Sequence, residues 1–295
     1  MEYSQETAAS TAEATNTVVP TSNGLPPETE LARRILETYS GIAPKDVPGV
    51  ICEIVSCFPK FLASSLVRIY HLPTRCEQTA SQGLCHFPYG CFQLFQFLNL
   101  ASTLADTRYQ DVLERLRAPD STETFLDVGC ALGTVVRLLA SQGVPDDRLY
   151  GTDLQAGLLD LGYELFGDRT WSRATYVAGD MLGEDHKTRL DDRLGGKIDI
   201  IYASAFFHLF EREGQLKAAK RMVGFLRPEN PGVMIFGQNQ GPKINGWEKY
   251  VLDPKSWKDL WEEVGQATGT RWRTEMDVDS SDEWNHVRFG VYRVF

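Results

Sequence analysis

The chain has 295 residues, of which 42% are hydrophobic and 11% aromatic, so it can bury a core for one elaborated α/β domain or two small ones. Its 40 acidic side chains outnumber the 30 basic ones, and the formal net charge of −10 would repel a phosphate backbone, so we expect no nucleic-acid partner. No run of 18 apolar residues occurs, and the N-terminus is polar rather than basic and then apolar. We therefore expect no membrane span, no secretion signal and a cytoplasmic location.

The cysteines form no C-x-x-C pair in a chain for which no secretion signal is expected. We therefore expect reduced, packing cysteines rather than disulfides, and no metal site. The six are Cys52, Cys57, Cys76, Cys85, Cys91 and Cys130.

Residues 1–27 are rich in Ser, Thr, Ala and Glu and end in the Gly24–Pro27 breaker. Such a segment buries little apolar surface, which predicts a disordered tail. Residues 28–119 then show apolar residues at helical spacing, interrupted by a proline-bearing loop over 71–90. This pattern predicts a helical layer with two or three short helices before His71.

Residues 120–295 alternate short β-rich runs with amphipathic segments such as Leu154–Phe166 and Glu211–Leu226. This alternation is typical of a mostly parallel sheet covered by helices. Two successive runs, Arg271–Val278 and His286–Val294, predict an antiparallel pair at the end. The other expected strands are Thr124–Asp127, Leu149–Thr152, Ala174–Ala178, Ile198–Ala203 and Val233–Gly237.

The run Phe125–Gly133 (FLDVGCALG) joins the first expected strand to a helix. Its glycines would let a ligand approach bare backbone at a helix N-terminus, where open α/β sheets bind nucleotides, although a simple turn is the alternative. A dinucleotide fingerprint needs glycines where this chain has Ala131 and Thr134, so no pyrophosphate cradle is predicted.

Acids follow the next two strands. Asp153 ends the second strand, where a carboxylate can accept from ribose hydroxyls; the alternative is an N-cap of the following helix. Asp180 ends the third strand, where it could accept from an adenine amino group while Met181 covers the ring, although an Asp after Gly is also an ordinary turn residue. Because parallel strands share one carboxyl edge, these groups predict a nucleoside site.

The string Leu126–Cys130, followed by Asp153 and Asp180, resembles the cofactor motifs of class I S-adenosylmethionine (SAM) dependent methyltransferases. The resemblance covers about residues 120–295. It implies SAM as cofactor and a Rossmann-like, mostly parallel seven-stranded sheet with an antiparallel C-terminal strand, under the helical layer as a lid. The cofactor contacts it implies are Asp127, Gly129, Cys130, Gly133, Asp153, Leu154, Asp180, Met181 and Ser204.

A second set of strings extends over most of residues 28–295: Tyr89–Cys91, Phe95–Leu98, Gly162–Phe166, Ser204–Phe210, Trp261–Gly265 and Thr268–Trp272. These strings resemble those of fungal secondary-metabolite methyltransferases, including those that esterify prenylated polyketide acids in meroterpenoid pathways. The resemblance implies O-methylation of a carboxylate. Two positions depart from it: Gly237–Gly241 carries no arginine, and no basic residue lies around Phe92–Phe95.

Methyl transfer is an in-line displacement, which needs alignment and a dry cavity more than a protein nucleophile. A carboxylate acceptor, with a reference pKa of about 4, is ionised at neutral pH, whereas a phenol, at about 10, needs a base. His208, just beyond the fourth strand, is the catalytic candidate, with packing among aromatics as the alternative. Phe92, Phe95 and Arg75 are candidate substrate contacts. The alternative is core packing for the two phenylalanines and a solvated surface charge for the arginine. Ser204 either touches the cofactor or caps a turn.

Three other functions remain open at this point. One is a phenol O-methyltransferase acting on an aromatic polyketide. Another is a SAM-fold cyclase or binding module that transfers no methyl group. The third, a dehydrogenase, is disfavoured by the incomplete glycine pattern. The expected partner is an apolar acid or phenol, and a homodimer is compatible with the sequence.

Overall fold

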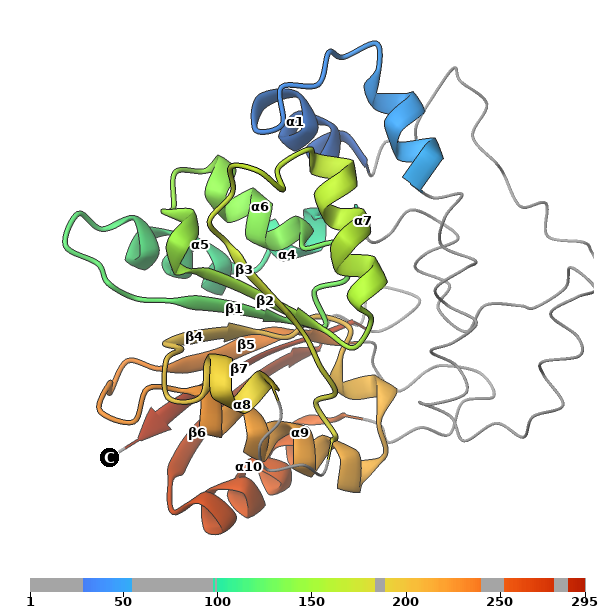
Figure 1. Cartoon of the computed structure of the whole chain (residues 1–295). Coiled ribbons are helices and arrows are strands. Elements are labelled where there is room, and N and C mark those ends of the chain that lie inside the picture. Colours follow the sequence, from blue (N-terminus) through green and yellow to red (C-terminus); the bar gives the residue numbers. More distant parts are fainter. Residues whose placement is uncertain are drawn as a thin grey trace, which may run out of the picture.

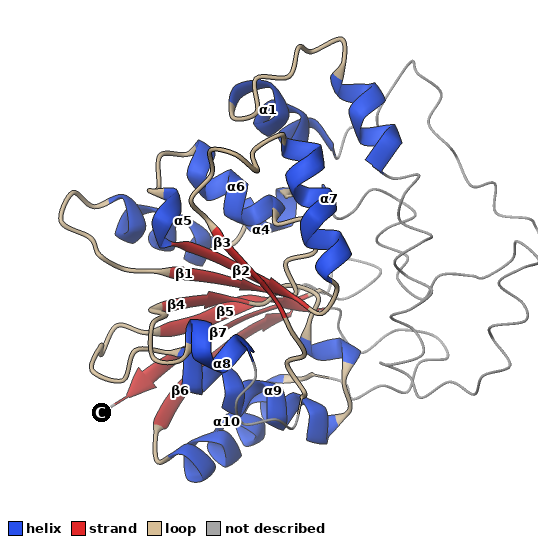
Figure 2. Cartoon of the chain, viewed as in Figure 1, coloured by secondary structure: helices blue, strands red, loops and turns tan. Residues whose placement is uncertain are grey.

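A computed structural model of the protein describes residues 29–54, 98, 100–183, 189–239, 252–278 and 286–294. Its centre is a seven-stranded sheet (Figures 1 and 2). The strands are β1 (Phe125–Val128), β2 (Leu149–Asp153), β3 (Thr175–Ala178), β4 (Ile200–Tyr202), β5 (Met234–Asn239), β6 (Arg271–Val278) and β7 (Val287–Val294). Their order is β3-β2-β1-β4-β5-β7-β6, and only β7 runs antiparallel to its neighbours. This confirms the predicted sheet and its antiparallel C-terminal pair.

Helices cover both faces of the sheet (Figure 1). One side, the α6 face, carries the N-terminal helices together with the two helices that follow β1 and β2. These are α1 (Glu30–Thr38), α4 (Ala101–Leu104), α5 (Thr107–Arg117), α6 (Thr134–Ser141) and α7 (Ala156–Phe166). The other side, the α9 face, carries α8 (Arg189–Leu194), α9 (Arg212–Phe225) and α10 (Pro254–Thr268).

The central strands are buried on both faces, which explains their continuous apolar character in the sequence. Every residue of β1 and β4 is buried. Phe125 of β1 pairs in register with Leu149 of β2 and with Ile200 of β4, so the three parallel strands start at one level, and β2 and β4 end within about one residue of the end of β1. Their carboxyl ends therefore form a common edge, at which the predicted acids lie.

In the segment from α10 to β7, local sequence signals specify where the helix and the first strand begin and end. Asp253 and Ser256 form a capping box at the start of α10, Pro254 occupies its first turn, and Gly269 ends it at φ +69°. β6 follows almost directly and pairs with β7 from Arg271 to Val278. The predicted bounds of β6 are thus confirmed, because the sequence marks both the stop of the helix and the start of the strand.

The N-terminal region is helical where it is described. The predicted periodicity is confirmed by α1 and by a helix over residues 47–54. The expected tail, the loop over 71–90, and the candidates Phe92, Phe95 and Arg75 lie outside the described residues. Of the cysteines in the described part, Cys52 and Cys130, neither forms a disulfide.

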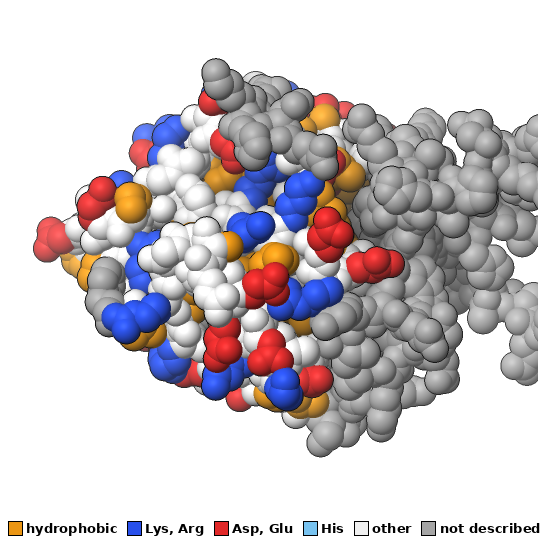
Figure 3. Space-filling model, turned by 90° about the horizontal axis from the view of Figure 1, so that it is seen from below, with side chains coloured by type: hydrophobic (Ala, Val, Ile, Leu, Met, Phe, Trp, Pro, Cys, Tyr) orange, Lys and Arg blue, Asp and Glu red, His pale blue; other side chains and the backbone are white. Residues whose placement is uncertain are grey.

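The outer surface seen from below in the view of Figure 1 carries acidic and basic side chains intermixed (Figure 3). On α10, Lys255 pairs with Asp259 at 2.6 Å and Lys258 with Glu262 at 3.6 Å. Among the residues that the structure describes, no helix is both long and apolar enough to cross a lipid bilayer.

Candidate active site

The loop between β1 and α6, residues Gly129–Gly133, is called the glycine loop and has an unusual backbone. Gly129, Ala131 and Gly133 all have left-handed φ values, of +72°, +48° and +66°. A Cβ atom at Gly133 would lie 2.5 Å from the Tyr176 ring, so only glycine fits there. Gly133 is also the N-cap of α6, and no described side chain caps the helix. The first N–H groups of α6 are therefore available to a ligand at this edge.

Asp153 holds this loop from the neighbouring strand. One carboxylate oxygen accepts the N–H of Ala131 at 2.9 Å, and the other accepts the N–H of Gln155 at 2.9 Å. Helix α7 begins at Ala156 with Gln155 as its N-cap, so the N-cap alternative for Asp153 is wrong, and the helix starts two residues later than predicted. The carboxylate instead stabilises the strained Ala131, and it retains lone pairs for a ligand.

Asp127 lies in β1, in register with Gly151 and Tyr202, and is only 4% exposed. Within the described residues no hydrogen bond reaches its carboxyl group. Burial, and then the nearby Asp153, raise the pKa of Asp127 to about 8. Burial also raises the pKa of Asp153, although backbone N–H donors oppose that shift. Two acids that have no basic partner among the described residues thus meet at this edge, which favours a ligand with a cation and hydroxyl groups.

The end of β3 lies beside Asp153, because the N–H of Gly179 donates to the Asp153 carbonyl at 3.0 Å. The exposed Asp180 accepts the N–H of Leu182 at 2.8 Å with one carboxylate oxygen, as a turn residue does. Met181 is buried in the core of the α9 face.

A neutral polar cluster lies at the ends of β4 and β5. The Gln238 side-chain amide donates to Ser102 Oγ at 2.8 Å and to Ser204 Oγ at 3.2 Å. Thr103 and Tyr202 share a further hydroxyl hydrogen bond of 2.8 Å, so α4 is bound to the sheet edge. Ser204 does not cap the next turn. The sequence analysis does not predict Gln238 as a site residue, although Gln238 lies in the Gly237–Gly241 segment that departs from the resembled family. Strand β5 continues to Asn239, two residues beyond its predicted end, and so includes Gln238.

His208 lies in the short 3-10 helix η6 (Phe207–Leu209), which follows β4 at the same edge, and it is half-buried. The turn before it is fixed, because Asn239 Oδ1 accepts the N–H groups of Phe206 and Phe207, both at 3.2 Å. Phe207 packs against the rings of Trp257 and Phe289. His208 is therefore carried by an anchored turn.

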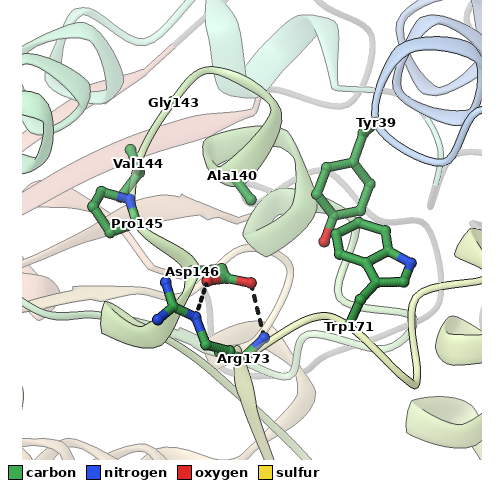
Figure 4. A pocket seen from close by; sticks show the side chains of 8 residues that line it. All are labelled: Tyr39, Ala140, Gly143, Val144, Pro145, Asp146, Trp171 and Arg173. Carbon is green, nitrogen blue, oxygen red and sulfur yellow. Dashed lines mark hydrogen bonds and ion pairs between the residues drawn. The ribbon is translucent and has the colours of Figure 1, made fainter.

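A pocket of about 420 Å³ lies at the other end of α6, away from the glycine loop (Figure 4). Tyr39 and Trp171 line it with their rings 4.8 Å apart, and Arg173 donates to Asp146. It borders the segment that leads into the amino end of β2. It is therefore separate from the carboxyl edge that carries Asp127 and Asp153.

Comparisons with known proteins identify the family. A methyltransferase domain family matches residues 125–229. The O-methyltransferase phiE of a fungal species is 38% identical over 215 residues, covering 70% of this chain and 69% of that protein. The methyltransferase trt5 of Aspergillus terreus is 34% identical and covers 84% of this chain and 88% of that protein. The chain belongs to the class I SAM-dependent methyltransferases of fungal secondary metabolism.

This methyltransferase shares its fold with a solved carbon methyltransferase, CurJ, at a TM-score of 0.51 and 14% identity, over 91% of this chain and 68% of that one. SAM is its cofactor. The dehydrogenase alternative is therefore excluded.

Proposed function

We propose that this methyltransferase transfers the methyl group of SAM to the carboxylate of an apolar, prenylated polyketide (meroterpenoid) acid and forms a methyl ester. The relatives support this: phiE is called an O-methyltransferase, and nvfJ of Aspergillus novofumigatus, 32% identical over 83% of this chain and 80% of that protein, is called an asnovolin E/chermesin D methyltransferase. The observation that carries the proposal is the neutral donor cluster of Ser102, Ser204 and Gln238 at the edge.

When bound, SAM supplies a sulfonium methyl group to the acceptor oxygen. The buried Asp127 carboxyl, which no described hydrogen bond reaches, suits the ammonium group of SAM. Asp153 accepts from the ribose hydroxyls with its remaining lone pairs. The proposed cofactor site is completed by the backbone and side chains of Gly129, Cys130, Gly133, Leu154, Asp180, Met181 and Ser204.

An ionised acceptor needs orientation but no base. Gln238 donates its amide hydrogens to Ser102 and Ser204 and so orients both serines. Their neutral O–H groups can then hold carboxylate oxygens in line with the methyl group. His208 then acts as a positioning group rather than a base. Phe92, Phe95 and Arg75 remain our proposals for the apolar and charged ends of the substrate.

The acceptor chemistry is tested with labelled SAM and a panel of prenylated acids and phenols. Label in a base-labile, extractable ester supports the proposal. At saturating SAM, the pH profile of kcat/KM for the acceptor should be flat above about pH 6, and His208→Gln should keep a measurable rate. For a phenol acceptor the base contributes about 10²- to 10⁴-fold, and the wild-type rate would rise with pH while the variant lost that rise. That outcome would replace the carboxylate proposal by the phenol alternative.

The cofactor site is tested separately with Asp153→Ala. We expect the SAM Kd to rise about 10- to 100-fold, because a hydrogen bond to a charged acceptor contributes about 1.5–3 kcal/mol. Asp160→Ala removes an exposed carboxylate of α7 and is the matched control. Equal SAM affinity in both variants, measured by calorimetry, would contradict the assignment of Asp153.

A further inference from the structure

Arg137 is a charged residue inside an otherwise apolar helix. It lies on α6, one turn after Gly133, and is 1% exposed. Its guanidinium forms two hydrogen bonds with the fully buried Asp168, of 2.7 and 2.8 Å. A third nitrogen donates to the backbone carbonyl of Leu132 at 2.6 Å, inside the glycine loop. A buried ion pair is costly in a core, so its placement against this one carbonyl requires an explanation.

This guanidinium is surrounded by aromatic rings of the Gly162–Phe166 string and by the ring of Tyr176 in β3. The string contributes no residue to the proposed cofactor site. The centre of the guanidinium lies 4.5 Å from the Phe166 ring, 5.5 Å from Tyr163 and 4.9 Å from Tyr176. At Gly162 a Cβ atom would lie 2.5 Å from the Leu132 carbonyl oxygen. The glycine therefore lets α7 approach the same carbonyl that Arg137 holds.

The loop is thus held from two sides at neighbouring residues. Asp153 accepts the N–H of Ala131, and Arg137 donates to the carbonyl of Leu132. The N-terminal layer joins the second contact, because the Tyr39 hydroxyl donates to Asp168 at 3.2 Å. Left-handed residues such as Ala131 persist only where surrounding contacts determine them.

We propose that Arg137, Asp168 and the Gly162–Phe166 string form a clasp that fixes the glycine loop in the conformation that binds SAM. Arg137 is a positioning residue: it contacts the loop carbonyl, not the cofactor. The inference rests on the proposed role of this loop in the cofactor site.

The decisive variant is Arg137→Met combined with Asp168→Asn. Removing both charges leaves no buried unpaired ion, so the full chain should fold and melt within a few degrees of the wild type. The SAM Kd should nevertheless rise on the order of tenfold to a hundredfold, because the loop loses its fixed geometry. Deuterium uptake of the peptide that contains Ala131–Gly133 should increase in the absence of SAM. Arg137→Lys, which keeps the charge, should have a SAM Kd and a deuterium uptake between those of the wild type and the double variant.

Trp261→Ala is the matched control, since it loosens the core of the α9 face and leaves the loop untouched. A folded double variant with wild-type SAM affinity and wild-type deuterium uptake would overturn the proposal. So would a control that loses SAM affinity to the same degree. If Asp153→Ala binds SAM as tightly as the wild type does, the proposed cofactor site is contradicted. Deuterium uptake in the SAM-free protein still tests whether the clasp fixes the loop.

Discussion

The two faces of the sheet bury different kinds of side chain. On the α9 face, Phe207, Trp257, Trp261 and Phe289 form a chain of tilted and edge-to-face rings. On the α6 face, the core includes the Arg137–Asp168 ion pair and adjoins the uncompensated acid Asp127. The α6 face also contains aromatic contacts, among Phe125, Tyr202 and Phe236, but it adds this buried ion pair, and it is the face on which the glycine loop is supported. Stability and ligand binding are therefore expected to separate by face.

The largest effect expected on stability alone comes from Trp261→Ala. The side chain is 1% exposed and contacts the rings of Trp257 and Trp272. Its removal should lower the free energy of unfolding by about 3–5 kcal/mol, through lost burial and the cavity left behind. Denaturant titration measures this loss. Below the melting transition the SAM Kd should stay at the wild-type value, and a parallel loss of affinity would show that the faces are coupled.

An intermediate, pH-dependent effect is expected for Asp127→Asn. Because the folded-state pKa is about 8, well above the ordinary value of 3.8, folded wild-type protein keeps a proton that the unfolded chain has lost. Wild-type stability without SAM should therefore fall as pH rises from about 4 to about 8. Asp127→Asn has no carboxyl group to titrate, so its Tm should rise relative to the wild-type Tm between pH 5 and pH 8.

SAM affinity should show the opposite trend. Binding of the SAM ammonium favours the ionised carboxylate, so wild-type affinity should rise with pH toward 8 while that of Asp127→Asn stays low and flat. Methylthioadenosine, which lacks the amino-acid part, is the matched ligand, and its affinity should not follow this pH dependence. Identical pH curves for both ligands would separate Asp127 from the ammonium group.

The smallest effect is expected for Ala131→Gly. A left-handed φ costs an L-residue about 1–2 kcal/mol, whereas glycine costs about 0.4–1 kcal/mol more chain entropy on folding. The net gain should be about 1 kcal/mol or less, read as a Tm increase of about 2 °C. Gly133→Ala makes the reverse change at a position where a Cβ meets the Tyr176 ring, and should be strongly destabilising. A loss of stability in Ala131→Gly would mean that the loop is not strained there.

Local sequence signals were sufficient for the sheet and for the acids at its edge. Buried strands appear as apolar runs, and glycine or acid residues end them, so the strand pattern predicts Asp153 and Asp180 on one edge, whereas Asp127 is a candidate through the family resemblance. The N-cap alternative for Asp153 was open for the same reason: the local pattern does not show that its carboxylate reaches back to Ala131.

Contacts between distant segments could not be predicted. Arg137 and Asp168 are separated by 31 positions, and Gln238 and Ser102 by 136, and no periodicity connects either pair. A signal for Arg137 did exist, since a lone arginine between Val136 and Leu138 in an apolar helix requires a buried partner. Which residue is that partner is shown only by the folded structure, in which α7 packs beside the loop.

The capping of α10 has a consequence for the order of folding. Its capping box and terminal glycine specify the helix locally, and the antiparallel β6 and β7 lie directly after it in the chain. The pairing of β1 with β4, by contrast, must close a loop between Phe125 and Ile200. We therefore expect the C-terminal unit to become structured first during refolding, with β6 and β7 amides protected before those of β1 in pulse-labelled hydrogen exchange.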